Sequence, residues 1–262
     1  MQCTSCGQEN PANASVCSRC NAPLPLTQLP VPEIGVGASY GYGWKQLWKH
    51  FWMLLLIGII VFAISLVASL FTQGISALGG LGGIGAGVDV AIAITAISVV
   101  FSLAYSIFLT NPLGYGVAFV YLKATRDDQV EVKDMFESFR CYWDAVLASL
   151  LVGLIVIVGI IFLIVPGIIF ACKLAFVPYL VVDRKIGAID SIKESWRMTG
   201  GYAWKVFLLY LLGIPIAIAG FICLGIGVIP ASMWINTALA TLYYAVSSKG
   251  QAAIQPEAST GI

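Results

Sequence analysis

Charge is what this sequence has least of. Only 10% of its 262 residues are charged, with 14 Lys and Arg against 13 Asp and Glu, whereas 59% are hydrophobic. Soluble domains carry about 25% charged residues, so this composition excludes an ordinary soluble protein. The net charge of +1 gives no general attraction for nucleic acid. We therefore expect a membrane protein whose partners are membrane lipids and another protein, without nucleic acid among them.

The sequence also lacks the residue sets that carry common catalytic chemistry. It has one histidine, His50, so a Ser-His-Asp arrangement has no obvious source of its base. No paired carboxylates lie within an apolar stretch, and the glycine-rich run at 79–87 lacks the Lys-Ser/Thr of a phosphate-binding loop. We predict that the protein is not an enzyme.

Residues 1–30 contain no apolar run behind a basic start, so we expect no signal peptide. Cysteines occupy that region instead, as two Cys-x2-Cys pairs with ten residues between them. Four thiolates at this spacing can close a tetrahedron around one zinc ion. We predict a zinc ribbon over residues 1–22, with zinc as the cofactor. Its ligands are Cys3, Cys6, Cys17 and Cys20.

Two other states of these cysteines compete with the zinc site. Disulfides suit an oxidising compartment, whereas the distribution of basic residues described below favours the cytosol. Iron would use the same sulfurs, but residues 1–22 include no aromatic residue to shield a redox centre. The three remaining cysteines lie in or beside apolar segments, and we expect them to be small buried hydrophobic side chains. They are Cys141, Cys172 and Cys223.

Four prolines between residues 23 and 38 predict an extended linker after the zinc ribbon. Residues 39–248 are predominantly apolar and predict a multi-pass membrane domain. Residues 249–262 are polar and predict a flexible C-terminal tail. The predicted fold is an all-α membrane protein behind a small N-terminal zinc ribbon.

Six apolar segments predict transmembrane helices, of which the fourth is short for a crossing. The second is too long for one straight crossing, so Asn111-Pro112 predicts a kink in it. Pro166-Gly167 predicts the turn between the third and fourth segments, and Pro215 lies inside the fifth. The segments are 51–71, a bent one within 88–122, 144–165, 168–182, one that ends near 226, and 231–247.

Basic residues supply an independent test of this topology. Lys and Arg occur before the first segment, between the second and third, between the fourth and fifth, and after the sixth. The three opposite connections contain none. The positive-inside rule then places both termini in the cytoplasm, as a zinc-bound thiolate cluster also requires. We expect the protein in the cytoplasmic (inner) membrane.

An internal echo appears in two charged segments. Glu137-Ser138-Phe139-Arg140 precedes the third apolar segment, and Glu194-Ser195-Trp196-Arg197 precedes the fifth. A similar aromatic and basic run, 44–52, leads into the first. We predict three helical hairpins, each led by an interfacial amphipathic helix. The alternative is that helices at the membrane edge converge on aromatic residues and arginine. The second charged segment, 184–205, could lie on anionic lipid.

Polar residues inside the apolar segments are candidates for an intramembrane site. Lys173 is the one basic residue outside the predicted cytoplasmic side. An ammonium near mid-depth costs several kcal/mol unless it is paired or hydrated. Asp89 is the nearest candidate partner, although Lys173 could also be hydrogen-bonded locally. Asn236 predicts a hydrogen bond between helices more readily than a ligand contact.

Several runs together resemble a known family. They are Asn111-Pro112-Leu113-Gly114, Met135-Phe136-Glu137-Ser138-Phe139, Phe162-Leu163-Ile164-Val165-Pro166-Gly167-Ile168 and Ala188-Ile189-Asp190-Ser191-Ile192-Lys193-Glu194-Ser195-Trp196. This pattern resembles the bacterial multi-pass family related to the membrane domain of glycerophosphodiester phosphodiesterases. The front of the chain resembles a zinc-ribbon module. The resemblance implies a membrane fold, and it carries no catalytic residue to this chain, which has no phosphodiesterase domain.

Two functions of different classes follow from these patterns. The first is a non-enzymatic integral membrane protein that acts as a scaffold, regulator or accessory subunit, with the zinc ribbon docking a cytosolic partner. The alternative is a transporter of a small solute or lipid with a polar site near Lys173. Polar residues that converge on a cavity would favour the transporter, and a solid bundle would favour the scaffold.

Overall fold

Helices make up the whole of the regular structure in the described part of the chain. The computed structural model describes residue 8 and residues 32–85, 88–222 and 227–258, and no strand occurs among them. The chain divides into the units Met1–Pro32 and Glu33–Ile262, and every helix belongs to the second. Apart from residue 8, the predicted zinc ribbon at 1–22 lies outside the described residues, as does most of the predicted linker at 23–38.

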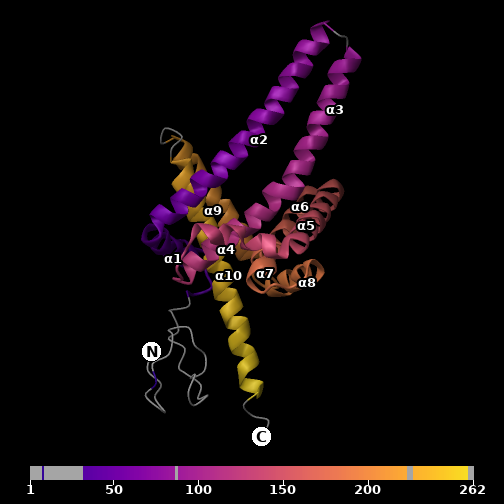
Figure 1. Ribbon diagram of the computed structural model, residues 1–262. Helices are drawn as coiled ribbons and strands as arrows, with labels where there is room; N and C mark the ends of the chain where they lie inside the picture. Colours follow the sequence, from indigo (N-terminus) through magenta and orange to yellow (C-terminus); the bar gives the residue numbers. More distant parts are fainter. Residues whose placement is uncertain (1–7, 9–31, 86–87, 223–226, 259–262) are drawn as a thin grey trace. The chain divides into compact units, whose positions relative to one another are not determined.

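In the described part of the second unit, ten α-helices and two other helical segments follow one another (Figure 1). Among the described residues the helices start before residue 39 and continue past residue 249, so they enter both the predicted linker and the predicted tail. The elements are α1 (Val36–Lys49), α2 (Phe51–Gly85), α3 (Val88–Tyr105), the π-helical η1 (Ser106–Thr110), α4 (Asn111–Thr125), the 3-10 helix η2 (Val132–Cys141), α5 (Tyr142–Phe162), α6 (Ile164–Lys173), α7 (Val177–Asp183), α8 (Ala188–Met198), α9 (Ala203–Ile222) and α10 (Val228–Ala258).

Five helical stretches in the described part are long and apolar enough to cross a membrane. By length and composition they make this chain a membrane protein, and they overlap the first five predicted segments. α10 covers the predicted sixth segment but is not one of the five. The five stretches are Phe51–Gly74, Ile92–Thr125, Val132–Phe162, Ile164–Asp183 and Ala203–Ile222.

α10 contains more polar residues than the other long helices, and several of them are buried in the core. Thr237 and Thr241 are fully buried, and each hydroxyl donates to the carbonyl one turn earlier, at 2.7 and 2.8 Å. This local bonding satisfies the hydroxyls without a partner from another helix. Tyr243 is also fully buried and stacks on Tyr179 of α7, with the ring centroids 4.9 Å apart. Burial among helices thus replaces contact with lipid.

α1 packs closely on α10. A Cβ on Gly43 would lie 3.1 Å from the backbone nitrogen of Ala238, so the glycine permits this approach. The Trp234 indole donates to the Tyr40 carbonyl at 3.0 Å, and the Tyr40 hydroxyl donates to the Leu209 carbonyl of α9 at 2.8 Å. These hydrogen bonds fasten α1 to both neighbouring helices.

The predicted kink at Asn111-Pro112 coincides with an irregular, π-helical turn in an otherwise continuous helical stretch. The π-helical turn η1 separates α3 from α4, and Pro112 is the second residue of α4. Proline has no N–H to donate to the Phe108 carbonyl four residues earlier. The Tyr142 hydroxyl donates to that carbonyl instead, at 2.8 Å. The first residue of α5 therefore satisfies a backbone group that the proline releases.

The turn between α5 and α6 falls earlier than predicted. Leu163 adopts the extended conformation that separates the helices, whereas Pro166 and Gly167 lie in the first turns of α6. Proline is tolerated there because the first N–H groups of a helix have no intrahelical partner. A Cβ on Gly159 would lie 2.9 Å from the Cα of Gly167, so these two glycines mark a close helix crossing.

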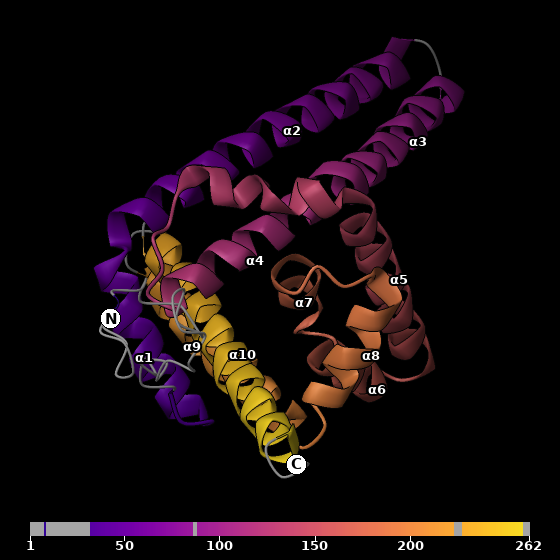
Figure 2. The same cartoon turned by 60° about the horizontal axis from the view of Figure 1, so that its bottom comes forward.

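α2 and α3 lie side by side as a long hairpin (Figures 1 and 2). The glycine-rich run at 79–87 is helical up to Gly85. Large side chains along both helices are exposed, including Trp52, Phe62 and Val100. Such exposure of apolar side chains suits contact with lipid.

Candidate functional site: a charged junction

Charged side chains meet at the end of α7. The Asp183 carboxylate accepts two parallel hydrogen bonds from the guanidinium of Arg126, which follows α4, one of them at 2.7 Å. The Tyr243 hydroxyl of α10 also donates to Asp183, at 3.1 Å. A bidentate Arg–carboxylate pair fixes orientation as well as distance. Asp183 therefore joins α7 to α4 and α10.

The two residues after Asp183 reach different helices. Arg184 pairs with Glu194 of α8 at 3.3 Å and donates to the Ser247 hydroxyl of α10 at 2.9 Å. Lys185 pairs with Glu137 of η2 at 3.1 Å. We call this set the charged junction, and it comprises Arg126, Glu137, Asp183, Arg184, Lys185 and Glu194.

Both halves of the predicted echo take part in this junction. Glu137 pairs with Arg140 at 3.3 Å, and Glu194 pairs with Arg197 at 2.8 Å, each across one helical turn. The serine after each glutamate, Ser138 or Ser195, is fully buried. In each motif, the glutamate therefore pairs with one basic residue of its own helix and with one basic residue of the segment after α7. They differ in helix type, since η2 is a 3-10 helix and α8 an α-helix.

A second set of charges joins α1 to the end of α4. Asp127 has a φ of 62°, and its N–H and that of Asp128 donate back to the carbonyls of Ala124 and Lys123. This is the left-handed helix ending that usually takes glycine. The hydrogen bond from Lys49 is the main cause that lowers the pKa of Asp127, and His50 adds to it from 3.3 Å. Asp127 therefore ends α4 in a left-handed conformation and pairs with Lys49 and His50 at the end of α1.

η2 has its own polar anchor on α4. Lys123 donates to the Asp134 carboxylate at 2.8 Å, and the same carboxylate accepts the backbone N–H of Glu131 at 2.8 Å. The Glu131 side chain completes a reciprocal capping box. A Cβ on Gly116 of α4 would lie 1.8 Å from the Met135 carbonyl oxygen. Polar bonds and backbone contact together hold η2 against α4.

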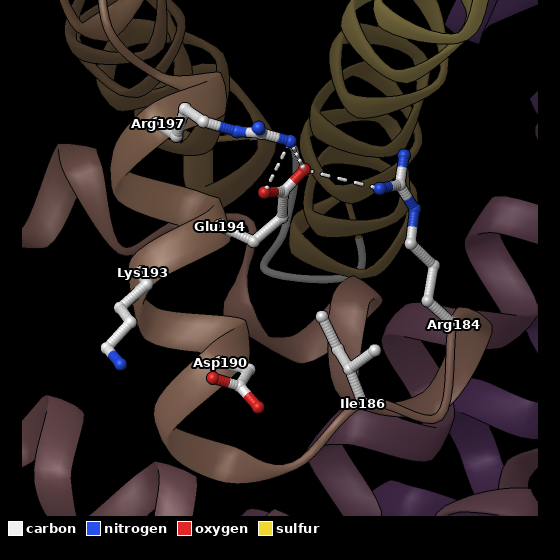
Figure 3. Close-up of a pocket in the computed structure, with 6 residues that line it drawn as sticks. All are labelled: Arg184, Ile186, Asp190, Lys193, Glu194 and Arg197. Atoms are coloured by element: carbon white, nitrogen blue, oxygen red, sulfur yellow. Dashed lines mark hydrogen bonds and ion pairs between the residues drawn. The ribbon is translucent and has the colours of Figure 1, made fainter.

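A shallow pocket of about 440 Å³ lies over α8 and the segment before it. Figure 3 shows Glu194 between Arg184 and Arg197, with dashed lines to both, while Lys193 points away from Glu194. The pocket is more basic than acidic, with three cations and two carboxylates. Its lining residues are Arg184, Ile186, Asp190, Lys193, Glu194 and Arg197.

The structure does not bring together the three residues predicted as an intramembrane site. Asp89 lies in the first turn of α3, Lys173 ends α6, and Asn236 lies in α10. Asn236 donates to the Ser232 carbonyl of its own helix at 2.8 Å. No hydrogen bond or ion pair joins any two of the three in the part of the chain that the structure describes.

Lys173 has a local environment that the sequence did not indicate. Its ammonium lies 4.0 Å from the centroid of the Trp196 ring, a cation–π contact. Its carbonyl accepts hydrogen bonds from the hydroxyls of Ser195 and Thr199, at 2.8 and 3.0 Å. α6 stops here, and α8 covers its end. The one available signal was the echo motif, which placed a tryptophan directly after Ser195.

The metal site stays a prediction. Within the described ranges no three His, Cys, Asp or Glu side chains are grouped to hold a metal ion. Cys3, Cys6, Cys17 and Cys20 all fall outside these ranges. Cys141 is half-buried and Cys172 is buried, both as free thiols.

The geometry can now be set beside known proteins. The model of one protein family, a domain of unknown function (DUF7847), matches residues 141–256. The match includes α5 to α9 and most of α10, with Asp183, Arg184 and Lys185 of the charged junction. Comparison with curated proteins and with solved structures returns no match.

Proposed function

We propose that this protein is a non-enzymatic integral membrane protein that acts as a scaffold, regulator or accessory subunit. The charged junction is the observation that carries the proposal. Its side chains pair with one another and with Tyr243 and Ser247 of α10, and they so connect α4, η2, α7, α8 and α10. Groups that are engaged in this way hold helices in fixed positions. They serve a platform better than they serve a reaction or a permeation path.

The proposed platform faces the cytosol. With α10 as a sixth crossing, both termini and the charged junction lie on the cytoplasmic side of the inner membrane. The distribution of Lys and Arg supports this orientation. α10 has 31 residues, about 46 Å at 1.5 Å each, which is ample for a crossing. Its buried polar side chains need not face lipid.

The zinc ribbon would then present a docking surface on the same side. Its four cysteines bind one zinc ion in this proposal, and a cytosolic or membrane protein is the partner. The relationship to the membrane domain of glycerophosphodiester phosphodiesterases is also a proposal. It is supported by the sequence runs around Pro166-Gly167 and Ser195-Trp196.

A transporter is the weaker alternative. It requires polar groups that converge on a path, and Lys173, Asp89 and Asn236 share no hydrogen bond or ion pair among the described residues. The cation–π contact of Lys173 with Trp196 gives its ammonium a local partner.

Purification of the full chain in mild detergent tests the scaffold proposal. We expect a protein to co-elute in fixed ratio with the wild type, to be lost from Cys3→Ser/Cys6→Ser, and to remain with the control Lys45→Gln. Quantitative mass spectrometry measures all three. Identical co-eluting proteins in all three samples, or solute uptake by vesicles reconstituted with the pure protein, would contradict the proposal.

A further inference from the structure

Positive charge exceeds negative charge around the C-terminal half of α8. Arg184, Lys193 and Arg197 line the pocket with two carboxylates, and Lys173 reaches the same helix through Trp196. Glu194 already pairs with both Arg184 and Arg197. Lys193 and Lys173 have no carboxylate partner in the described part of the chain. The exposed Lys193 ammonium is therefore available to an external anion, and the half-buried Lys173 adds positive charge beside Trp196 on the same helix.

Apolar side chains are exposed beside these cations. Ile189 is 57% exposed and Trp196 is 39% exposed. Together with Lys193 they are spaced by three or four residues, so they share one face of α8. The opposite face is buried through Ser191 and Ser195. α8 thus presents apolar and cationic side chains side by side, as membrane–water interfaces select.

We propose that this face of α8 binds the phosphate of an anionic phospholipid headgroup. Lys173 and Lys193 supply the charge that attracts it, and Arg184 and Arg197 border the pocket that receives it. The exposed Ile189 and Trp196 contact the lipid below the headgroup. A soluble phosphate would leave these two side chains without a partner, which is why the occupant is a lipid. The proposal rests on the membrane placement above but not on docking by the zinc ribbon.

Native mass spectrometry of the delipidated full chain in detergent tests the site. The probes are dioctanoyl phosphatidylglycerol and dioctanoyl phosphatidylcholine, which have equal chains and differ in net charge. We expect the wild type to prefer phosphatidylglycerol. Each of Lys173→Met and Lys193→Gln should weaken that binding about fivefold, the effect of one cation near an anionic surface.

Lys45→Gln is the matched control for Lys193→Gln, because Lys45 is likewise an exposed lysine on a helix that carries an exposed tryptophan, Trp44. It should bind phosphatidylglycerol as the wild type does. Arg197, whose side chain is 75% exposed, provides a further variant, Arg197→Gln, should the lysine variants unfold. It too should bind phosphatidylglycerol about fivefold more weakly.

Three results would overturn the site. They are equal binding of the two lipids by the wild type, unchanged binding in folded lysine and arginine variants, and full displacement of the lipid by millimolar inorganic phosphate. The last would assign the pocket to a soluble anion. Loss of the scaffold function has a separate signature, since Cys3→Ser/Cys6→Ser should lose its protein partner and keep phosphatidylglycerol.

Discussion

Gly116 is the residue where one methyl group should matter most. A Cβ there would lie 1.8 Å from the Met135 carbonyl oxygen, so α4 and η2 would have to separate. We expect Gly116→Ala to lower the free energy of unfolding by about 1–3 kcal/mol, the range for overpacking. Denaturant unfolding in detergent measures it.

Gly114 provides the control in the same helix. A Cβ at Gly114 meets nothing within 4 Å. Gly114→Ala should therefore be neutral or stabilising, since alanine is the better helix former. Equal losses of stability in both variants would show that the α4–η2 contact is not what makes Gly116 necessary.

Asp127 makes a prediction about pH. Its hydrogen bond from Lys49 lowers its pKa in the folded state, so the ionised form stabilises the fold. That contribution is complete above the unfolded pKa of about 4 and is lost as pH falls through the lower folded value. The pair is partly exposed, so we expect Asp127→Asn to cost less than about 1 kcal/mol at pH 7.

The thermal unfolding midpoint, measured from pH 7 down to pH 3, checks this sign. The difference between wild type and Asp127→Asn should be constant above pH 5 and shrink below about pH 4. Asparagine keeps tolerance for the left-handed backbone, so the variant isolates the charge. A difference that grows on acidification would contradict the assigned pairing.

Sequence reasoning at this scale found unusual residues but not their partners. Lys173 stood out because it was the one basic residue within an apolar segment. Its contact with Trp196 depends on where α6 stops and how α8 folds back, and local sequence does not encode either. Arg184 and Lys185 belong to the segment that we predicted to lie on anionic lipid, and their pairs with Glu194 and Glu137 were not predicted.

At the scale of elements, the broken helix α3–η1–α4 yields a coupled prediction. Tyr142 donates to the Phe108 carbonyl that Pro112 leaves without its usual donor. We expect Tyr142→Phe to cost about 1 kcal/mol, a typical hydrogen bond. The cost should shrink in a Pro112→Ala background, where residue 112 regains an N–H. A double-mutant cycle on unfolding free energies measures the coupling.

Equal costs of Tyr142→Phe in the two backgrounds would show that the hydroxyl does not replace the missing donor. Trp143→Phe on the neighbouring exposed residue controls for loss of aromatic surface. It should show no coupling to Pro112→Ala.

Prolines were the main sequence signal for the ends of helices, and Pro166 was misleading because the turn falls before it. Pro112 has helical residues on both sides, so its missing N–H removes a hydrogen bond inside a helical stretch. Pro166 instead lies in the first turn of α6, where the missing N–H has no consequence. In the sequence, both prolines simply follow an apolar stretch. The structure distinguishes them, because the chain leaves the helical conformation at Leu163, three residues before Pro166.

At the scale of the whole molecule, composition was enough to predict an all-helical membrane protein. The role of α10 was harder to predict. Its Thr237, Thr241 and Tyr243 lower its hydropathy, and their burial depends on neighbouring helices that the local sequence does not specify. Basic residues predicted the sidedness of the charged segments without indicating that these segments pair with one another.

The zinc ribbon remains a prediction at this scale. We expect one zinc per chain in the wild type and none in Cys3→Ser/Cys6→Ser, by elemental analysis of the purified protein. The membrane unit should remain in the membrane, because every described helix lies within the unit Glu33–Ile262. Failure of the variant to insert, or unchanged zinc, would contradict an autonomous zinc-binding module.

The central claim is that the charged junction faces the cytosol, and accessibility from outside the cell tests it most directly. Cysteines introduced at the exposed positions Asp89, Gln129 and Asp190 are treated with a membrane-impermeant maleimide in intact cells, with the wild type as background. We predict labelling above background for Asp89→Cys alone. Gln129→Cys and Asp190→Cys should label only after the membrane is permeabilised. Labelling of Asp190→Cys in intact cells would contradict the account.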